Sequence, residues 1–385
     1  MPRHAVFLPP GETMRYLLLS LLSCLALSAC QPGTDAPVQT TTAEAVKTQA
    51  ESAEKLQVKA VVVAMFEIGE DEGDRPGEFQ FWKERYGLTE KYPFPHGFHD
   101  LYYNPEKGVL GMVTGMGIAR ASSAFTALGL DPRFDLTKAY WLIAGIAGID
   151  PQDGSIGSAV WTDYLVDGDL AHQIDAREIP EDWSTGYFPL FANEPYPEQE
   201  GEVVARNGEV FQLNTMLVDW AFNLTKDIEL MDTDAMLALR SKYTEMPAAQ
   251  LPPKVLRGDH LSASTFWHGK LFNDWANDWT AFWTNGKGNF MTSGMEDTGS
   301  YQALTYLDNA GLADKKRVMV LRTASNFTMQ PTGMTAAENL ASESSGAGYA
   351  GMLPSLEAAY KVGSTVIDEI VLNWDKYQDT LPGQQ

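Results

Sequence analysis

The feature that most constrains the fold is a series of short apolar runs that alternate with segments of helical periodicity. The first run, Val58-Lys-Ala-Val-Val-Val-Ala64, is rich in β-branched residues, which is typical of a strand buried on both faces of a parallel sheet. Further apolar runs lie at 109–113, 140–144, 159–166 and 318–321, and helical patterns lie at 118–129, 210–224, 235–243, 300–309 and 355–374. The alternation predicts a single α/β domain with three α/β/α layers and a mixed, largely parallel central sheet.

The N-terminus has the pattern of a targeting segment. Met14-Arg15 precedes an apolar run at 16–27, which is too short to span a membrane and has the length of a signal-peptide core. The run ends in Leu27-Ser-Ala-Cys30, which resembles the lipobox of bacterial lipoproteins, whose cysteine is lipidated after cleavage. We therefore expect residues 1–30 to be a lipoprotein signal peptide, with Met14 as the better start and Cys30 as the lipidated residue. An ordinary secretory signal is the alternative.

Two parts follow the signal peptide. Residues 31–55 are rich in Thr, Ala, Gln and Glu and predict a flexible tether, and residues 56–385 hold the folded domain. No segment after the signal contains the roughly 20 consecutive apolar residues of a membrane-spanning helix. By the same resemblance, Gln31 after the cysteine favours the periplasmic face of the outer membrane. Membrane contact is then expected only through the lipid anchor.

Charge and cysteine content narrow the range of ligands. A net charge of −23 argues against a nucleic-acid partner or an anionic membrane surface. The two cysteines both lie in the signal region, so we expect no disulfide and no cysteine-based metal site. His260 and His268 are too far apart, and lack acid or cysteine partners, for a metal site. We expect no metal and no other cofactor.

Ligands of such sheets bind beyond the carboxyl ends of the strands, so the loops there are the candidate site. The loop after the first strand carries five carboxylates within residues 67–74. Glu67, nearest the strand, could orient or deprotonate a water molecule. A solvated acidic loop, with or without a bound cation, is the alternative, and mutual repulsion would raise the pKa of any buried carboxylate in it.

Two glycine-rich segments follow the next strands. Gly115-Met-Gly117 joins a strand to a helix, and such a turn presents backbone N–H groups to a ligand. It lacks the third glycine and the acidic residue of a dinucleotide-binding motif. Gly145-Ile-Ala-Gly148 ends a buried strand with small residues, which indicates either close approach of a ligand or tight packing.

Three further segments could supply walls for a nucleoside. Asp259 precedes an aromatic pair in which Phe266 could stack on a base, although such rings also serve as core. Glu296, after Met295, needs partners if buried, and a ribose diol offers two donors. Asn326 offers a donor and an acceptor to a purine edge. The alternatives are a helix N-terminal acid for Glu296 and a turn amide for Asn326.

Together these motifs resemble the nucleoside phosphorylase/nucleosidase superfamily. The matching motifs are Ala64-Met-Phe-Glu67, Gly115-Met-Gly117, Gly145-Ile-Ala-Gly148, Gly258-Asp259 with Phe266, Met295-Glu296 and Arg322-Thr-Ala-Ser-Asn326. More closely, Met65-Phe-Glu-Ile-Gly-Glu-Asp71 with Pro76-Gly-Glu78, Gly294-Met-Glu-Asp-Thr298 and Leu321-Arg-Thr-Ala-Ser-Asn-Phe327 resemble the purine nucleoside permease family.

The resemblance implies the nucleoside phosphorylase fold and a purine nucleoside as ligand. It implies that Met295 lies against the sugar, that Glu296 takes the sugar hydroxyls, and that Asn326 meets the purine. Gly115, Gly117, Gly145, Asp259, Phe266 and Arg322 complete the expected nucleoside site. By analogy with the superfamily, a homo-oligomer is expected.

Two departures from the superfamily bear on the reaction. Phosphorylases place an Arg and a Ser where this chain has Ile143 and Ile146, and aliphatic side chains cannot clamp a phosphate; Arg120 is the remaining candidate. Hydrolytic nucleosidases carry an Asp where this chain has Asn326, which can hold N7 only through a hydrogen bond. We expect hydrolysis of the N-glycosidic bond, with Glu67 and Asn326 catalytic, in support of nucleoside uptake or salvage. A non-catalytic nucleoside-binding lipoprotein acting in transport and a phosphate-dependent phosphorylase are the alternatives.

Overall fold

The computed structural model describes residues 55–197, 201–343 and 348–384, and the account below concerns these residues. Met14, Cys30 and nearly all of the expected tether lie outside them, so the signal peptide and the lipid anchor stay predictions. The predicted strand at the start of the domain is present as β2 (Ala60–Ala64), and all five of its residues are buried. Its two neighbours, β5 (Val109–Val113) and β7 (Tyr140–Ile149), pair with it in parallel.

The central sheet has ten strands and mixed pairing. Nine of them run in the order β11-β8-β12-β13-β7-β2-β5-β4-β3, and β14 pairs with both β7 and β8. The remaining bounds are β3 (Glu90–Tyr92), β4 (Leu101–Asn104), β8 (Ala159–Asp167), β11 (Val210–Gln212), β12 (Val255–Ser262), β13 (Phe290–Gly294) and β14 (Val318–Phe327). Most paired residues lie in parallel ladders, because the long β14–β7 and β12–β8 pairs are parallel. The predicted mixed, largely parallel sheet is confirmed.

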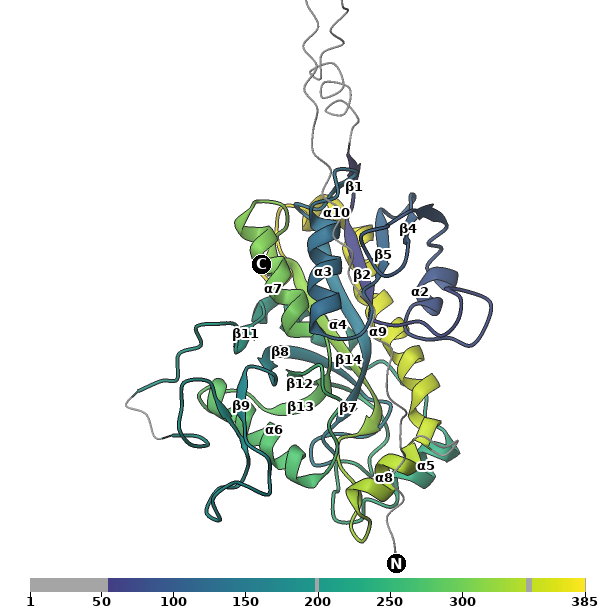
Figure 1. The fold of residues 1–385 in the computed structure, drawn as a ribbon. Helices are drawn as coiled ribbons and strands as arrows, with labels where there is room; N and C mark the ends of the chain where they lie inside the picture. The colour runs from purple at the N-terminus through teal and green to yellow at the C-terminus, as the bar shows by residue number, and fades with distance from the viewer. Residues whose placement is uncertain (1–54, 198–200, 344–347, 385) are drawn as a thin grey trace, which may run out of the picture. The chain divides into compact units, whose positions relative to one another are not determined.

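Helices cover both faces of this sheet (Figure 1). Phe125 of α3 (Ile118–Gly129) stacks on Trp141 of β7, whereas Gly363 of α9 (Met352–Leu372) packs over the next residue of the strand, Leu142. Neighbouring residues of a strand point to opposite faces, so α3 and α9 lie on opposite sides. The helix α7 (Asp297–Asn309) packs beside α3, and α6 (Lys270–Trp283) packs on β12 and β13. This arrangement gives the three expected layers.

The remaining elements are short. They are β1 (Leu56–Gln57), paired with β6 (Phe134–Asp135); β9 (Ala171–Gln173), paired with β10 (Tyr187–Pro189); and α2 (Gln80–Arg85), α4 (Thr215–Thr225), α5 (Asp234–Arg240), α8 (Ala336–Glu343) and α10 (Trp374–Tyr377). Among the described residues no helix is long and apolar enough to cross a membrane.

The strands β7 and β14 extend beyond the apolar runs that predicted them, and both extensions contribute residues to the candidate site described below. The run at 140–144 continues through glycines to Ile149, and the run at 318–321 continues through polar residues to Phe327. The register of β14 against β7 shifts between Ala324 and Asn326, which is a β-bulge at Ser325. A bulge re-aims the side chains that follow it.

Candidate functional site

A pocket of about 260 Å³ lies where β2, β7, β13 and β14 end or bend. Its lining comprises Met65, Phe66, Glu78, Met116, Ile146, Ala147, Gly148, Phe266, Ser293, Gly294, Met295, Glu296, Arg322, Ser325 and Asn326. Five of the predicted site residues are therefore brought together: Phe266, Met295, Glu296, Arg322 and Asn326. Because of the bulge, the consecutive residues Ser325 and Asn326 both face the pocket.

The turn from β13 into α7 places the carboxylate of Glu296 in the pocket. Glu296 is the residue before α7 and is only 3% exposed. Its Oε1 accepts the Gly117 N–H at 3.0 Å, and its Oε2 accepts the Met295 N–H at 3.2 Å and an Arg322 Nη2–H at 3.0 Å. Oε1 therefore keeps one lone pair that a ligand hydroxyl can use, whereas both lone pairs of Oε2 are taken.

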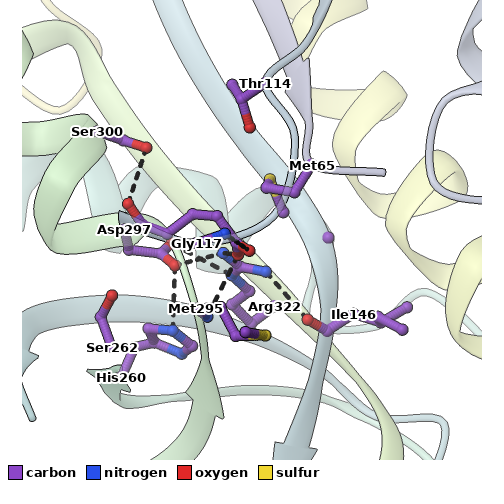
Figure 2. Close-up of polar contacts among 12 residues, drawn as sticks. Met65, Thr114, Gly117, Ile146, His260, Ser262, Met295, Asp297, Ser300 and Arg322 are labelled. Atoms are coloured by element: carbon purple, nitrogen blue, oxygen red, sulfur yellow. Dashed lines mark hydrogen bonds and ion pairs between the residues drawn. The ribbon is translucent and has the colours of Figure 1, made fainter. Parts of the chain in front are cut away.

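Among the described residues, Arg322 is the only cation that lines the pocket, and it is almost fully buried, at 1% exposed. Its Nη1 donates to the Ile146 carbonyl at 3.0 Å, its Nε donates to Asp297 Oδ1 at 3.2 Å, and its Nη2 also donates to Asp297 Oδ2. Figure 2 shows the guanidinium between Asp297 and Ile146, with Met295 beside it. Burial alone would raise the pKa of Asp297, but Arg322 and His260 offset burial and hold that pKa well below its usual value.

Two glycines make room for this arginine. A Cβ on Gly145 would lie 2.0 Å from Met65 Cε, 2.6 Å from Glu78 Oε1 and 2.9 Å from Arg322 Nη1. A Cβ on Gly294 would lie 3.0 Å from His260 Nε2 and 3.3 Å from Arg322 Cζ. Gly145 therefore does not line the pocket. Its missing side chain leaves the space behind the lining that Met65, Glu78 and Arg322 occupy.

Glu78 is the functional candidate that sequence reasoning missed. It lines the pocket at 6% exposed, and its oxygens accept the Ile146 N–H and the Met65 N–H, both at 2.7 Å. Burial raises its pKa to about 8, although Arg322 lowers it, and the nearby Glu296 raises it further. The sequence signal that could have identified Glu78 is the permease-like motif Pro76-Gly-Glu78. Glu78 nevertheless lies far along the chain from the end of β2 at Ala64.

Glu67 has a different environment from the one expected. Its oxygens accept the backbone N–H groups of Ile68 at 2.8 Å, Phe79 at 2.8 Å, Gln80 at 2.6 Å and also Gly77. The carboxylate therefore closes the loop between β2 and α2 and satisfies N–H groups at the start of α2. The structure does not bring Glu67 into the pocket lining; Glu78 occupies that place.

Asp259 also lies outside the lining. Its oxygens accept the Tyr164 N–H at 2.8 Å and the Asn289 N–H at 2.5 Å, and burial raises its pKa to about 7. The register of β12 shifts between Asp259 and the next residue, so that Asp259 faces these backbone groups while His260 lies 3.1 Å from Asp297. A register shift of this kind has no signature in the sequence of β12.

The turn at Gly115 and Gly117 borders the pocket through Met116, although neither glycine is part of its lining. Their φ angles of +80° and +94° lie in the region that glycine adopts without strain. The turn places Met116 in the lining and the Gly117 N–H on Glu296. Arg120 instead lines a separate cavity of about 360 Å³ on the other side of this turn, with Thr114 and Phe98.

At the far end of the pocket lie groups suited to a flat polar ligand. Phe266 is 57% exposed, so its ring has a free face. Asn326 Oδ1 accepts the Ser325 hydroxyl at 3.0 Å, and Nδ2 donates to the Phe327 carbonyl at 3.2 Å, which leaves one amide hydrogen and one lone pair. In the described part of the chain, no group of three or more His, Cys, Asp or Glu side chains is arranged to hold a metal ion.

Fold and site thus define an α/β domain with a buried carboxylate–arginine pocket beside its parallel strands. The model of the family described as "Purine nucleoside permease (NUP)" matches residues 57–382. The chain therefore belongs to the purine nucleoside permease family.

Two curated relatives illustrate the match. A purine nucleoside permease of Candida albicans is 33% identical over 330 residues, which cover 84% of this chain and 77% of the relative. A probable purine nucleoside permease of Schizosaccharomyces pombe is 32% identical over 294 residues, which cover 75% and 81%.

Similar solved structures come from Helicobacter pylori. Futalosine hydrolase is 16% identical, with a TM-score of 0.47 over 82% of this chain and 98% of that one. A 5'-methylthioadenosine/S-adenosylhomocysteine nucleosidase in complex with a pyrrolidine compound is 15% identical, with a TM-score of 0.47 over 82% and 100%.

Proposed function

We propose that this domain binds purine nucleosides and hydrolyses their N-glycosidic bond. The observation that carries the proposal is the placement of Glu78 at the pocket floor, buried and beside Arg322 and Glu296. A carboxyl group whose pKa is raised to about 8 can exchange a proton near neutral pH, as a general base requires. The name of the family and of the relatives supplies the ligand class, a purine nucleoside.

In the proposed complex, one group of pocket residues contacts the sugar and another contacts the base. Glu296 would accept a ribose hydroxyl through Oε1, and Met295 and Met65 would contact the sugar. Asn326 would donate to N7 of the purine, and Phe266 would cover the ring. In this pose C1' of the ribose lies between the base end and the charged floor, where Glu78 can hold a water molecule.

The reaction then needs two kinds of charge stabilisation. As the glycosidic bond breaks, the ribose develops oxocarbenium character, which the carboxylates Glu296 and Glu78 stabilise electrostatically. Ionised Glu78 takes the proton of the attacking water as its oxygen bonds to C1'. The bonding electrons leave with the purine, whose N7 side is held by Asn326, and the purine is protonated by solvent.

The charge distribution favours water over phosphate as the nucleophile. Of the residues that the structure describes, Arg322 is the only cation in the lining, and it is already bonded to Asp297, Glu296 and Ile146. Ile146 contributes backbone groups to Glu78 and Arg322, while Ile143 is wholly buried in β7. A phosphate dianion would meet carboxylates without a free guanidinium to pair with.

A chromatographic assay of inosine and adenosine, with and without phosphate, tests this proposal. We expect free base and ribose in both conditions. No free base in either condition would exclude the enzyme, and base only with phosphate would assign phosphorolysis instead.

A second candidate function is nucleoside capture without turnover, as part of an uptake system. The permease names of the family and of its relatives favour it. It predicts calorimetric binding of inosine with no release of hypoxanthine. An affinity that Glu296→Gln weakens would still identify the same pocket.

We also propose that residues 1–30 direct lipidation at Cys30, that the following segment up to residue 55 tethers the domain, and that the domain lies at the periplasmic face of the outer membrane. The lipobox-like sequence before Cys30 supports this location. Cys30→Ser should move the protein from the membrane fraction to the soluble fraction. Light scattering of the soluble variant would test the homo-oligomer expected by analogy.

A further inference from the structure

Behind the pocket lies a chain of buried polar groups that the reaction does not use directly. Asp297 and His260 are both 0% exposed, and His260 Nε2 lies 3.1 Å from Asp297 Oδ2. His260 Nδ1 lies 2.9 Å from the Thr292 hydroxyl, also 0% exposed. Figure 2 shows the Asp297 carboxylate in contact with both the His260 imidazole and the Arg322 guanidinium. None of these atoms lies against Asn326 or the base end.

The chain fixes how the guanidinium distributes its hydrogen bonds. Asp297 takes the Nε–H and one Nη2–H of Arg322, and Ile146 takes an Nη1–H. Glu296 receives only a single contact, from Nη2 at 3.0 Å. A planar guanidinium facing one carboxylate normally pairs with both of its oxygens. Without Asp297, Glu296 would be the partner for such a pair, and both of its oxygens would turn away from the ligand.

The same orientation brings Arg322 toward the second carboxylate. A Cβ added to Gly145 would lie 2.6 Å from Glu78 Oε1 and 2.9 Å from Arg322 Nη1. The carboxylate of Glu78 and the guanidinium of Arg322 therefore approach each other over this glycine. The charged and titratable groups that face the guanidinium are Glu78 before α2, Glu296 and Asp297 at the start of α7, and His260 on β12.

We propose that Asp297 and His260 are positioning residues, which hold the Arg322 guanidinium so that Glu296 stays open to the hydroxyl groups of a sugar and Glu78 keeps its cationic neighbour. This inference rests on the proposed function for the identity of the ligand. His260 acts through Asp297, because its Nε2 faces only that carboxylate and its Nδ1 is tied to Thr292.

Variants of both residues test the proposal by binding and by pH dependence. In Asp297→Asn the Arg322 guanidinium pairs with Glu296, so calorimetry should show inosine binding weakened at least 10-fold. The midpoint of kcat/KM against pH should move to higher pH, because the guanidinium that turns to Glu296 no longer lowers the pKa of Glu78. His260→Leu should produce the same two changes to a smaller degree. His260→Gln, which restores an N–H donor at the position of Nε2, should return both values to within about threefold of the unmodified protein.

The control is a buried arginine pair elsewhere. Arg240, 4% exposed, binds Asp232 through both terminal nitrogens near α5, outside the pocket. Asp232→Asn should lower the melting temperature and leave the inosine Kd and the pH midpoint unchanged. If Asp297→Asn and His260→Leu behave in this way too, their role is structural and the proposal is wrong.

The binding measurement separates this proposal from the proposed reaction. If the unmodified protein binds inosine but releases no hypoxanthine, hydrolysis is wrong, and the ratio of inosine affinities among the variants decides the positioning role alone. If the unmodified protein does not bind inosine, both proposals fall.

Discussion

Two strand-to-helix connections bring buried glutamates to the pocket, and they differ in how directly the sequence reveals this. In the β13–α7 connection, Glu296 follows the last residue of the strand, Gly294, by two positions and points at the ligand site. In the β2–α2 connection, the strand ends at Ala64, and the pocket carboxylate is Glu78, beyond a loop with several other acids. A short turn leaves the side chain little freedom, whereas a long loop can present any of its residues.

The long connection explains why Glu78, and not Glu67, lines the pocket. Glu67 accepts backbone N–H groups from both ends of the loop, including Phe79 and Gln80. These bonds fold the loop back over β2, and that fold carries Glu78 into the pocket. The first acid, Glu67, therefore holds the loop together, and the last one, Glu78, lines the pocket.

The largest expected effect comes from the acid at the end of the long loop. Glu78→Gln keeps the side-chain volume and removes the proton acceptor, so kcat for nucleoside hydrolysis should fall by about 10²- to 10⁴-fold. The inosine Kd should change by no more than a few-fold. Single-turnover assays with inosine measure the first value, and calorimetry measures the second. A kcat within tenfold of the unmodified enzyme would remove Glu78 from the reaction.

The acid of the short turn should control binding more than turnover. Glu296→Gln weakens the acceptor for a ribose hydroxyl, and a hydrogen bond to a charged group contributes about 1.5–3 kcal/mol. We expect the Kd of inosine to rise about 10- to 100-fold in calorimetry. The isolated base hypoxanthine, which has no ribose, serves as the matched probe, and its affinity should change little. Equal losses for nucleoside and base would show that Glu296 acts on the fold of the pocket instead.

The pH dependence of catalysis and of folding should report on Glu78. Because the pKa of Glu78 is raised to about 8, its ionised form grows about tenfold per pH unit below that value, and kcat/KM should rise accordingly and level off above about pH 8. Folding should respond with the opposite sign. A carboxyl group with a raised pKa binds its proton more tightly in the folded state, so its contribution to stability is lost as pH rises from about 4.5 to about 8. Glu78→Gln should flatten both profiles, measured by initial rates and by urea unfolding.

The first acid of the loop should matter for stability more than for chemistry. Glu67→Gln leaves several backbone N–H groups short of an acceptor, which costs about 1–3 kcal/mol in the free energy of unfolding. Turnover should fall less than tenfold, through displacement of Glu78. A loss of kcat as large as that of Glu78→Gln, with unchanged stability, would restore Glu67 to the role that the sequence suggested.

The sequence predicts a feature well when that feature depends on residues that are close together in the chain. The buried strands and the Met295-Glu296 turn depend on residues that are neighbours in the chain, so the sequence indicates where they lie. The partners of Arg322 come from β7, from α7 and, through Asp297, from β12, so they depend on tertiary contacts. The bulge at Ser325 and the register shift at Asp259 decide which side chains face inward, and neither has a sequence signature. For these reasons the roles proposed for Glu78, Asp297 and His260 rest on the structure, although Glu78 and Asp297 stand in permease-like motifs.

The smallest effect is expected at Arg120, the remaining candidate for a phosphate clamp. Its side chain lines the cavity on the other side of the Gly115–Gly117 turn and is absent from the pocket that holds Glu78 and Glu296. Arg120→Gln should therefore leave kcat/KM for inosine within about twofold, in the presence and in the absence of phosphate. Release of base by the unmodified protein that requires phosphate and is lost in Arg120→Gln would contradict this result. It would mean that the turn moves when ligand binds, and that an arginine outside the present pocket supplies the cation that Arg322, bound to its own carboxylates, does not offer.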